Sequence, residues 1–149
     1  MVLLDELLRT TRALDEAGVE HALVGGLALA VWGAPRATKD IDLLVRTVDL
    51  ERAVQVAKDQ GFDIVALRMK FRDGMELQRV TRARDGELLT LDFLLVNDSL
   101  EPVWASRVRL AVGAGELTVI SRDALIQMKA LAGRPQDIAD IERLRAIDR

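Results

Sequence analysis

The sequence predicts one domain of the α/β (α+β) class, in which helices pack around a mixed β-sheet. Three observations predict this fold. Helical and strand-like patterns alternate from the N-terminus to Gly61, paired strand patterns with glycine-containing turns follow, and two helical patterns end the chain. A chain of 149 residues suits a single domain spanning residues 1–149, and it can bury about two-thirds of its unfolded surface.

The N-terminal part of the chain, up to Gly61, is expected to contain three helices separated by two short buried strands. Leucines at helical spacing indicate the first helix, and Gly33 with Pro35 stops the second. The third helix is amphipathic, with Leu50, Val54 and Ala57 on one face. In chain order these elements are a helix at 3–16, a strand at 21–24, a helix at 27–32, a strand at 41–45 and a helix at 49–60.

The remaining residues are expected to form strands first and helices last. Asp85 and Gly86 are typical of the turn of a hairpin, Ser121 can cap a helix, and Pro135 can open the final one. In chain order we expect strands at 62–67, 75–82 and 88–96, a short helix at 100–107, strands at 108–112 and 117–120, and helices at 124–132 and 135–144.

The composition excludes several classes of protein. The chain has no cysteine, so it has no disulfide, no thiolate nucleophile and no cysteine-ligated zinc site. His21 is the single histidine and is expected to be structural, which excludes most Ser-His-Asp hydrolases. A net charge of −3 does not attract nucleic acid to the surface as a whole, and 3% aromatic residues leave few side chains on which bases could stack. Any contact with nucleic acid would have to be local. With no apolar run near the ~20 residues of a membrane span and no signal-peptide pattern, we expect a cytoplasmic protein with no membrane partner.

Two aspartates, Asp40 and Asp42, interrupt an apolar strand pattern. In an extended chain, residues i and i+2 point to the same face and lie about 6.6 Å apart. Two carboxylates at that separation repel by roughly 2–3 kcal/mol at an effective dielectric constant of 20. A divalent cation removes this repulsion, and carboxylate oxygens suit Mg²⁺. By itself, however, the spacing indicates a solvated strand end more often than a metal site.

Two further positions have both a structural and a functional interpretation. Gly25-Gly26 can form a tight turn between strand and helix, or it can let the backbone approach a phosphate group closely. Asp92 is the one charged residue in the run 88–96, where an unpaired buried carboxylate is costly. Asp92 therefore needs either an arginine partner or a metal ion.

The order of these motifs resembles the DNA polymerase β-like nucleotidyltransferase superfamily. Its signature is an apolar residue, Gly, then Gly or Ser, a spacer of about a dozen residues, and an Asp-x-Asp between apolar residues. Here Val24-Gly25-Gly26 is followed by residues 27–39 and then by Asp40-Ile41-Asp42, and the third carboxylate of the family corresponds to Asp92. The stretch 36–42 is most similar to the prokaryotic branch of AbiEii-type and MNT-type toxin–antitoxin nucleotidyltransferases.

The resemblance implies the polymerase β-like nucleotidyltransferase fold, with a catalytic core at about 20–96 and a C-terminal helical part at about 121–149. It also implies transfer of a nucleoside monophosphate from an NTP to a protein, a tRNA or a small molecule such as an aminoglycoside, with a cognate toxin or antitoxin as partner. Two Mg²⁺ ions, or Mn²⁺, would assist, and the ion at Asp92 would activate the acceptor hydroxyl. The implied catalytic and metal-binding residues are Asp40, Asp42 and Asp92, and the implied nucleotide-binding residues are Gly25, Gly26, Arg36, Thr38 and Lys129.

Lys129 lies at the edge of the buried face of its predicted helix, where a lysine needs a partner for its ammonium group. The residues that follow resemble the Lys…Arg…Asp ending of the AbiEii-like branch, in which the lysine approaches the nucleotide phosphates. The alternatives are that Lys129 extends to solvent, or that it pairs with Asp137 or Asp140 and joins the last two helices.

Other functions remain as alternatives. The fold can serve as an antitoxin or regulatory binding module, and an Asp-x-Asp phosphohydrolase of the haloacid dehalogenase type is a weaker candidate because no Gly-Gly precedes the motif in that family. Six basic residues within 68–84 are expected to form a solvated face, with a phosphate- or RNA-contacting edge as the alternative. They are Arg68, Lys70, Arg72, Arg79, Arg82 and Arg84.

Overall fold

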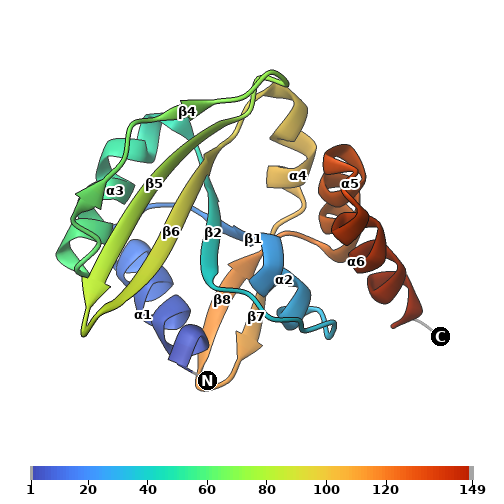
Figure 1. The fold of residues 1–149 in the computed structure, drawn as a ribbon, viewed down its shortest axis with the longest axis horizontal. Helices are drawn as coiled ribbons and strands as arrows, with labels where there is room; N and C mark the ends of the chain where they lie inside the picture. The colour runs from blue at the N-terminus through green and yellow to red at the C-terminus, as the bar shows by residue number, and fades with distance from the viewer. Residues whose placement is uncertain (1, 148–149) are drawn as a thin grey trace.

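The computed structural model describes residues 2–147, and an eight-stranded mixed sheet forms its centre (Figure 1). The strand order is β3-β5-β6-β2-β1-β8-β7, and β4 pairs with β5 outside this path. The sheet is mixed because β2 is antiparallel to β1 and parallel to β6. The strands are Ala22–Val24 (β1), Asp40–Val45 (β2), Ile64–Val65 (β3), Met69–Lys70 (β4), Glu76–Arg84 (β5), Glu87–Leu95 (β6), Val108–Val112 (β7) and Gly115–Val119 (β8).

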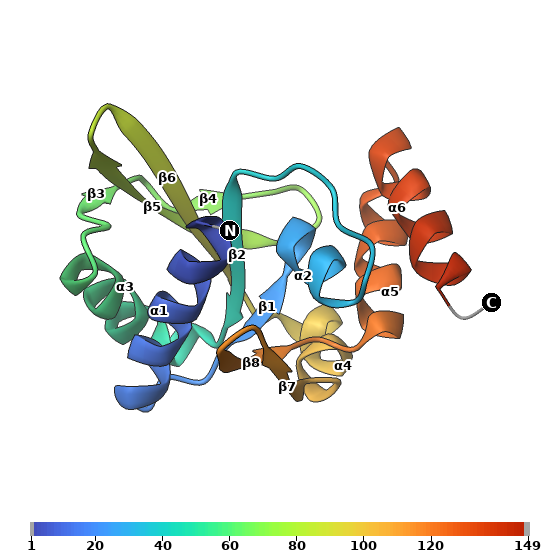
Figure 2. The same ribbon diagram turned by 90° about the horizontal axis from the view of Figure 1, so that it is seen from below.

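Six α-helices surround this sheet in the part of the chain that the structure describes. Figure 2 shows α1 and α3 beside each other against the sheet, while α5 and α6 stack together at the other end of the molecule. The helices are Val2–Glu16 (α1), Gly25–Val31 (α2), Leu50–Asp59 (α3), Glu101–Ala105 (α4), Arg122–Ala132 (α5) and Pro135–Ala146 (α6), and 3₁₀ turns at Thr47–Asp49 and Asp98–Leu100 precede α3 and α4.

Local sequence signals set the ends of several elements as expected. The Ser121 hydroxyl accepts a hydrogen bond from the Ala124 amide and caps α5. Gly133, with φ +64°, ends α5, and Pro135 opens α6. Asp85 and Gly86 both have positive φ, which suits the two-residue turn between β5 and β6.

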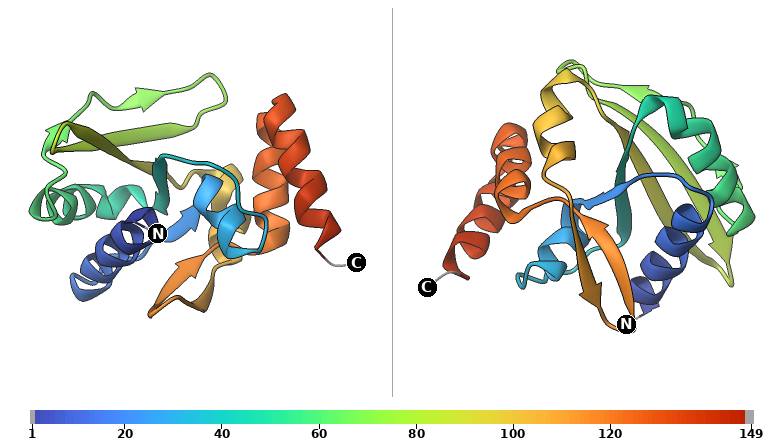
Figure 3. Two further views of the ribbon diagram at one scale, coloured as in Figure 1. Left: turned by 60° about the horizontal axis from the view of Figure 1, so that its bottom comes forward. Right: turned by 180° about the vertical axis from the view of Figure 1, so that it is seen from behind.

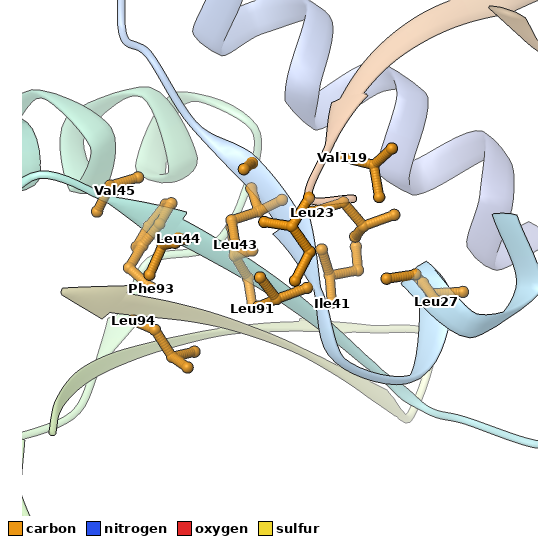
Figure 4. Packing of buried hydrophobic residues seen from close by; sticks show 14 of the residues in the cluster. Leu23, Leu27, Ile41, Leu43, Leu44, Val45, Leu91, Phe93, Leu94 and Val119 are labelled. Carbon is orange, nitrogen blue, oxygen red and sulfur yellow. The ribbon is translucent and has the colours of Figure 1, made fainter. Parts of the chain in front are cut away.

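The core and the candidate site lie on opposite faces of β2 and β6. Figure 4 shows Ile41, Leu43 and Leu91 packed in one fully buried cluster. Leu94 extends from the other side of β6. Because successive side chains alternate across a strand, the aspartates of β2 and β6 point away from that cluster. Burial of the apolar neighbours therefore forces the carboxylates onto the opposite face.

Three elements differ from the sequence-based expectation. The helix α2 begins at Gly25 itself, so the glycine pair forms its first turn. The strand expected at 62–67 is only Ile64–Val65, because it is a short edge strand that pairs with β5 over two residues. The two-residue strand β4 was not expected, because it too depends on pairing with β5. Among residues 2–147, no helix combines the length and the apolar composition needed to cross a membrane.

Candidate active site

The strand register brings two of the predicted aspartates side by side. Asp42 on β2 faces Val24 on β1 in one direction and Asp92 on β6 in the other. Asp40 lies two residues before Asp42 on the same face and is exposed at the start of β2. Adjacent strands are about 4.8 Å apart, so Asp42 and Asp92 form a close carboxylate pair.

Gly25 leaves the space that the Asp42 side chain fills. A Cβ atom at Gly25 would overlap Asp42 Oδ2, and the residue has φ +73°, which side chains other than glycine rarely adopt. Gly26 is buried, and a Cβ atom there would lie 2.9 Å from Thr38 Oγ1. The first glycine thus fits the carboxylate, and the second fits the loop that leads into β2.

Gly25→Ala is expected to lower both stability and nucleotide binding, because alanine would strain the backbone by about 1–2 kcal/mol and displace the Asp42 carboxylate. Gly86→Ala is the matched control, since Gly86 has φ +79° and no atom within 4 Å of the added Cβ. Thermal unfolding and NTP titration check the two variants. Equal losses of stability with unchanged NTP affinity in both would contradict the contact with Asp42.

Asp42 experiences a surplus of negative charge. Burial, together with the neighbouring charges of Asp92 and Asp40, raises the pKa of Asp42 to about 7. Arg79 and Lys129 act against this rise in the pKa. The surroundings of Asp42 therefore favour the protonated carboxyl more than water does.

Asp92 was expected to have either an arginine partner or a metal ion, and in the structure it has the arginine. Its two carboxylate oxygens accept hydrogen bonds from Arg79 Nε at 2.9 Å and Arg79 Nη2 at 3.0 Å. The Asp92 side chain is 5% exposed, whereas that of Arg79 is 43% exposed. The hydrogen bond to Asp92 raises the pKa of Arg79. Asp92 is therefore buried and neutralised from the solvent side by a partly exposed arginine.

A network of buried ion pairs joins the last two helices next to Asp42. Lys129 Nζ lies 3.0 Å from Asp140 Oδ2 and 3.5 Å from Asp137 Oδ1, and all three side chains are buried. Asp140 also accepts from Arg36 Nε at 3.1 Å, and Asp137 accepts from Arg134 Nε at 2.6 Å. The pairing expected as an alternative for Lys129 is thus present, and the network places three cations at one end of the site.

Lys129→Met is expected to reduce both stability and NTP affinity. Each aspartate keeps one arginine, so the loss of stability should be about 2 kcal/mol, below the ~3–5 kcal/mol of a charge left unpaired. Removal of a compact cation beside the site should raise the Kd for NTP at least tenfold, as measured by calorimetric titration. Lys58→Met, at an exposed position of α3, is the control. Wild-type NTP affinity in Lys129→Met would remove Lys129 from the nucleotide site.

A cavity of about 520 Å³ opens over these residues. One part of its wall is polar and includes Gly25, Asp40, Asp42, Lys129 and Arg134. The rest is mainly apolar and comes from β5, β6, α5 and the turn between β4 and β5. The other predicted site residues do not line this cavity. Gly26 and Asp92 adjoin the lining residues Gly25 and Asp42, Arg36 is connected to it through Asp140, and Thr38 lines a separate pocket of about 400 Å³.

The sequence of the chain matches a described protein family. The match covers residues 3–149, and the family is described as "Nucleotidyl transferase of unknown function (DUF2204)". The chain belongs to this nucleotidyl transferase family. A comparison with curated protein sequences gives no significant match.

Solved structures with the nucleotidyl transferase fold resemble this family member over nearly its whole length. A Thermotoga maritima structure described as a candidate nucleotidyltransferase has a TM-score of 0.69 at 15% identity, covering 99% of this chain and 94% of its own. ANT(2'')-Ia in complex with adenylyl-2''-tobramycin has a TM-score of 0.66 at 15% identity, covering 97% and 88%. Helicobacter pylori JHP933 has a TM-score of 0.56 at 18% identity, covering 92% and 62%. The predicted fold class and nucleotidyltransferase fold are therefore confirmed.

Nucleotidyl transferases typically use divalent metal ions, and the donor set of this member fits such an ion. Carboxylate oxygens are the ligands that Mg²⁺ prefers, and Asp40, Asp42 and Asp92 lie on one face of the neighbouring strands β2 and β6. Within residues 2–147, no three carboxylate, imidazole or thiolate groups are arranged to hold a metal ion as they stand. Both oxygens of Asp92 accept hydrogen bonds from Arg79, so this ion pair would have to open before Asp92 could act as a ligand.

A larger groove of about 670 Å³ lies between α1 and the β7–β8 hairpin, but its charges are already paired. Arg109 lies 3.1 Å from Asp15 and 3.4 Å from Glu116 in this groove. Behind it, His21 is 2% exposed, and its Nδ1 lies 3.1 Å from the Val19 carbonyl oxygen. Burial lowers the pKa of His21. The expected structural role of His21 is consistent with this position.

Sequence reasoning did not identify Arg79 as a site residue. The two-residue turn at Asp85-Gly86 sets the register of the β5–β6 hairpin, in which the numbers of two facing residues add up to 171. This register places Arg79 opposite Asp92. The expected solvated face is present at Arg68, which is exposed. The prediction of a solvated face is wrong for Arg82, which is 9% exposed and donates a hydrogen bond from Nη1 to Glu6 Oε2 at 2.8 Å.

Proposed function

We propose that the protein transfers a nucleoside monophosphate from an NTP to an acceptor hydroxyl with the help of Mg²⁺ or Mn²⁺. The observation that carries the proposal is the carboxylate pair of Asp42 and Asp92 on neighbouring strands, beside the glycine that makes room for it. Phosphoryl transfer requires mainly positioning and neutralisation of charge, and this chain supplies both without histidine or cysteine. Asp40, Asp42 and Asp92 would hold up to two metal ions, which would supply positive charge to the attacking oxygen and to the leaving pyrophosphate.

The residues around these carboxylates would bind the phosphate groups or support the site. Gly25 exposes its backbone to the cavity and allows a phosphate group to approach, while Lys129 and Arg134 supply positive charge on the same wall. Asp140 keeps Arg36 and Lys129 beside each other. Gly26 and Thr38 support the proposed nucleotide site by packing the loop before β2 against α2.

The acceptor is a protein side chain, a tRNA end or a small molecule. The complex of ANT(2'')-Ia with adenylyl-2''-tobramycin supports the small-molecule class, because its fold is similar and its ligand is an adenylylated small molecule. The similarity of residues 36–42 to toxin–antitoxin nucleotidyltransferases supports a role in such a system, with a cognate toxin or antitoxin as partner. In this proposal residues from about 20 to 96 are the catalytic core, and the helices α5 and α6 complete the nucleotide site.

A labelling experiment tests this function. The protein is incubated with each α-³²P-labelled NTP, with Mg²⁺ or Mn²⁺, and with total RNA, cell lysate or aminoglycosides in separate reactions. We expect metal-dependent label on one acceptor class and none with Asp42→Asn. Label that is equal with Asp42→Asn, or that persists in EDTA, would contradict the proposal.

A second candidate is a binding module that uses the fold as an antitoxin or regulatory subunit. It is favoured by the Asp92–Arg79 ion pair, which occupies both oxygens of the third carboxylate. A binding module predicts a stable complex with a partner protein, no transferred label, and no effect of Asp92→Asn on partner binding. Catalysis predicts that Asp92→Asn abolishes the label.

A further inference from the structure

We propose that the apolar part of the candidate cavity binds the base of the NTP, so that the base and the triphosphate of one nucleotide occupy the two parts of one cavity. This inference rests on the proposed function and adds the residues that hold the base. The wall concerned is formed by Phe71, Met75, Leu77, Leu94, Leu125 and Met128.

The two parts of the cavity differ in chemistry. Asp42, Lys129 and Arg134 lie on the polar part, where a metal-bound triphosphate finds charged partners. The apolar side chains come from β5, β6 and α5, and Phe71 and Met75 come from the ends of the β4–β5 turn. In the left view of Figure 3, this turn projects past the sheet on the side where α5 stands. One ligand with a charged end and a flat apolar end matches this division.

The β4–β5 turn holds its apolar side chains at the cavity by its own hydrogen bonds. The Phe71 amide donates to the Met75 carbonyl oxygen at 2.8 Å, and the Gly74 amide donates to the Phe71 carbonyl oxygen at 3.0 Å. Asp73 Oδ1 accepts from the Met75 amide at 3.0 Å. The turn is thus ordered, yet Phe71 remains 48% exposed. Phe71 is continuous with the other apolar side chains of the cavity wall, and contiguous exposed apolar surface marks a ligand site.

A nucleobase suits this wall better than the acceptor does. Bases have flat apolar faces that stack on aromatic side chains, and methionine adapts to the surface of a ring. A cavity of about 520 Å³ also falls within the usual range of small-ligand sites. Asp92, the carboxylate assigned to the acceptor, is 3% exposed and does not line the cavity. Asp92 therefore does not bring the acceptor against the apolar wall, which leaves this wall to the base.

Titrations of Phe71→Ala and Met128→Ala test the base site. Each variant and the wild type are titrated with the four NTPs and with inorganic tripolyphosphate in Mg²⁺, and thermal melting confirms folding. We expect the Kd of the tightest NTP to rise about tenfold in each variant, in line with the loss of one stacking contact. The Kd of tripolyphosphate should stay within twofold of the wild type. Leu67→Ala is the control, because Leu67 is 90% exposed and lies outside the cavity wall.

Three results would overturn the base site. Wild-type NTP affinity in both variants would show that neither side chain contacts the base. An equal loss of NTP and tripolyphosphate affinity would place their effect at the phosphate end. If the wild-type protein binds neither NTP nor tripolyphosphate, the proposed function fails and the base site fails with it. Met128→Leu keeps the apolar wall and should retain NTP affinity within threefold; a loss as large as that of Met128→Ala would point to a specific thioether contact instead.

Discussion

Asp42→Asn is expected to abolish nucleotidyl transfer and, at the same time, to stabilise the metal-free protein above pH 7. Transfer should stop because an amide cannot replace the central carboxylate of the cation site. Stability should rise because burial, Asp92 and Asp40 raise the pKa of Asp42 to about 7, so the ionised form is unfavourable in the folded state. A loss of function that accompanies a gain in stability is a known trade-off at active sites.

The pH dependence follows from the sign of this pKa shift. Below about pH 4, Asp42 is protonated in both the folded and the unfolded protein and costs nothing. Between about pH 4 and pH 7 the unfolded state releases its proton first, so the wild type progressively loses stability; above pH 7 the loss is constant. At about 1.4 kcal/mol per unit, the full loss is on the order of 4 kcal/mol.

Thermal unfolding in EDTA at pH 5 and pH 8 measures this effect. The gain of Asp42→Asn over the wild type should be larger at pH 8 than at pH 5, and Mg²⁺ should stabilise the wild type but not the variant. Asp63→Asn, at an exposed position, is the control and should leave the thermal stability unchanged at both pH values. A gain that is the same at both pH values would show that Asp42 is an ordinary solvated carboxylate.

Asp92→Asn is expected to lower the rate of transfer roughly a thousandfold while leaving the Kd for NTP within about threefold. Asp92 lies beside Asp42 but outside the wall of the cavity, so its loss affects the acceptor side more than nucleotide binding. A metal ligand contributes several kcal/mol to a transition state, and a factor of ten in rate corresponds to about 1.4 kcal/mol. Single-turnover kinetics and NTP titration separate the two effects.

Arg79→Gln is the matched control for Asp92, because it removes the same ion pair and leaves the carboxylate in place. Asp92→Asn leaves only the 43% exposed Arg79 without its partner and should cost about 1 kcal/mol of stability. Arg79→Gln leaves the buried Asp92 carboxylate unpaired and should cost more, up to ~3–5 kcal/mol, so thermal melting must confirm that this variant is folded. Transfer should persist in Arg79→Gln. Equal losses of transfer in the two variants would show that Asp92 acts as the partner of Arg79 and not as a ligand.

The sequence by itself determined the local elements and the face on which the acidic residues lie. Alternation of apolar residues along β2 and β6 required Asp40, Asp42 and Asp92 to point away from the core. The turn at Asp85-Gly86 also determined that Arg79 faces Asp92, because a two-residue turn sets the register of its hairpin. These features depend on residues that are close in the chain, so a pattern in the sequence can predict them.

Only the tertiary structure decided which of these residues meet. The parallel pairing of β2 with β6 aligns Asp42 with Asp92, although α3 and three strands lie between them in the chain. Docking of α6 against α5 brings Asp140 to Lys129 and Arg36, and the overlap between Gly25 and Asp42 depends on how β1 lies beside β2. Such contacts depend on register and packing between distant segments, where a shift of one residue would turn each side chain to the other face. The same physical reason explains why Phe71, whose turn follows an unexpected edge strand, became visible only in the folded protein.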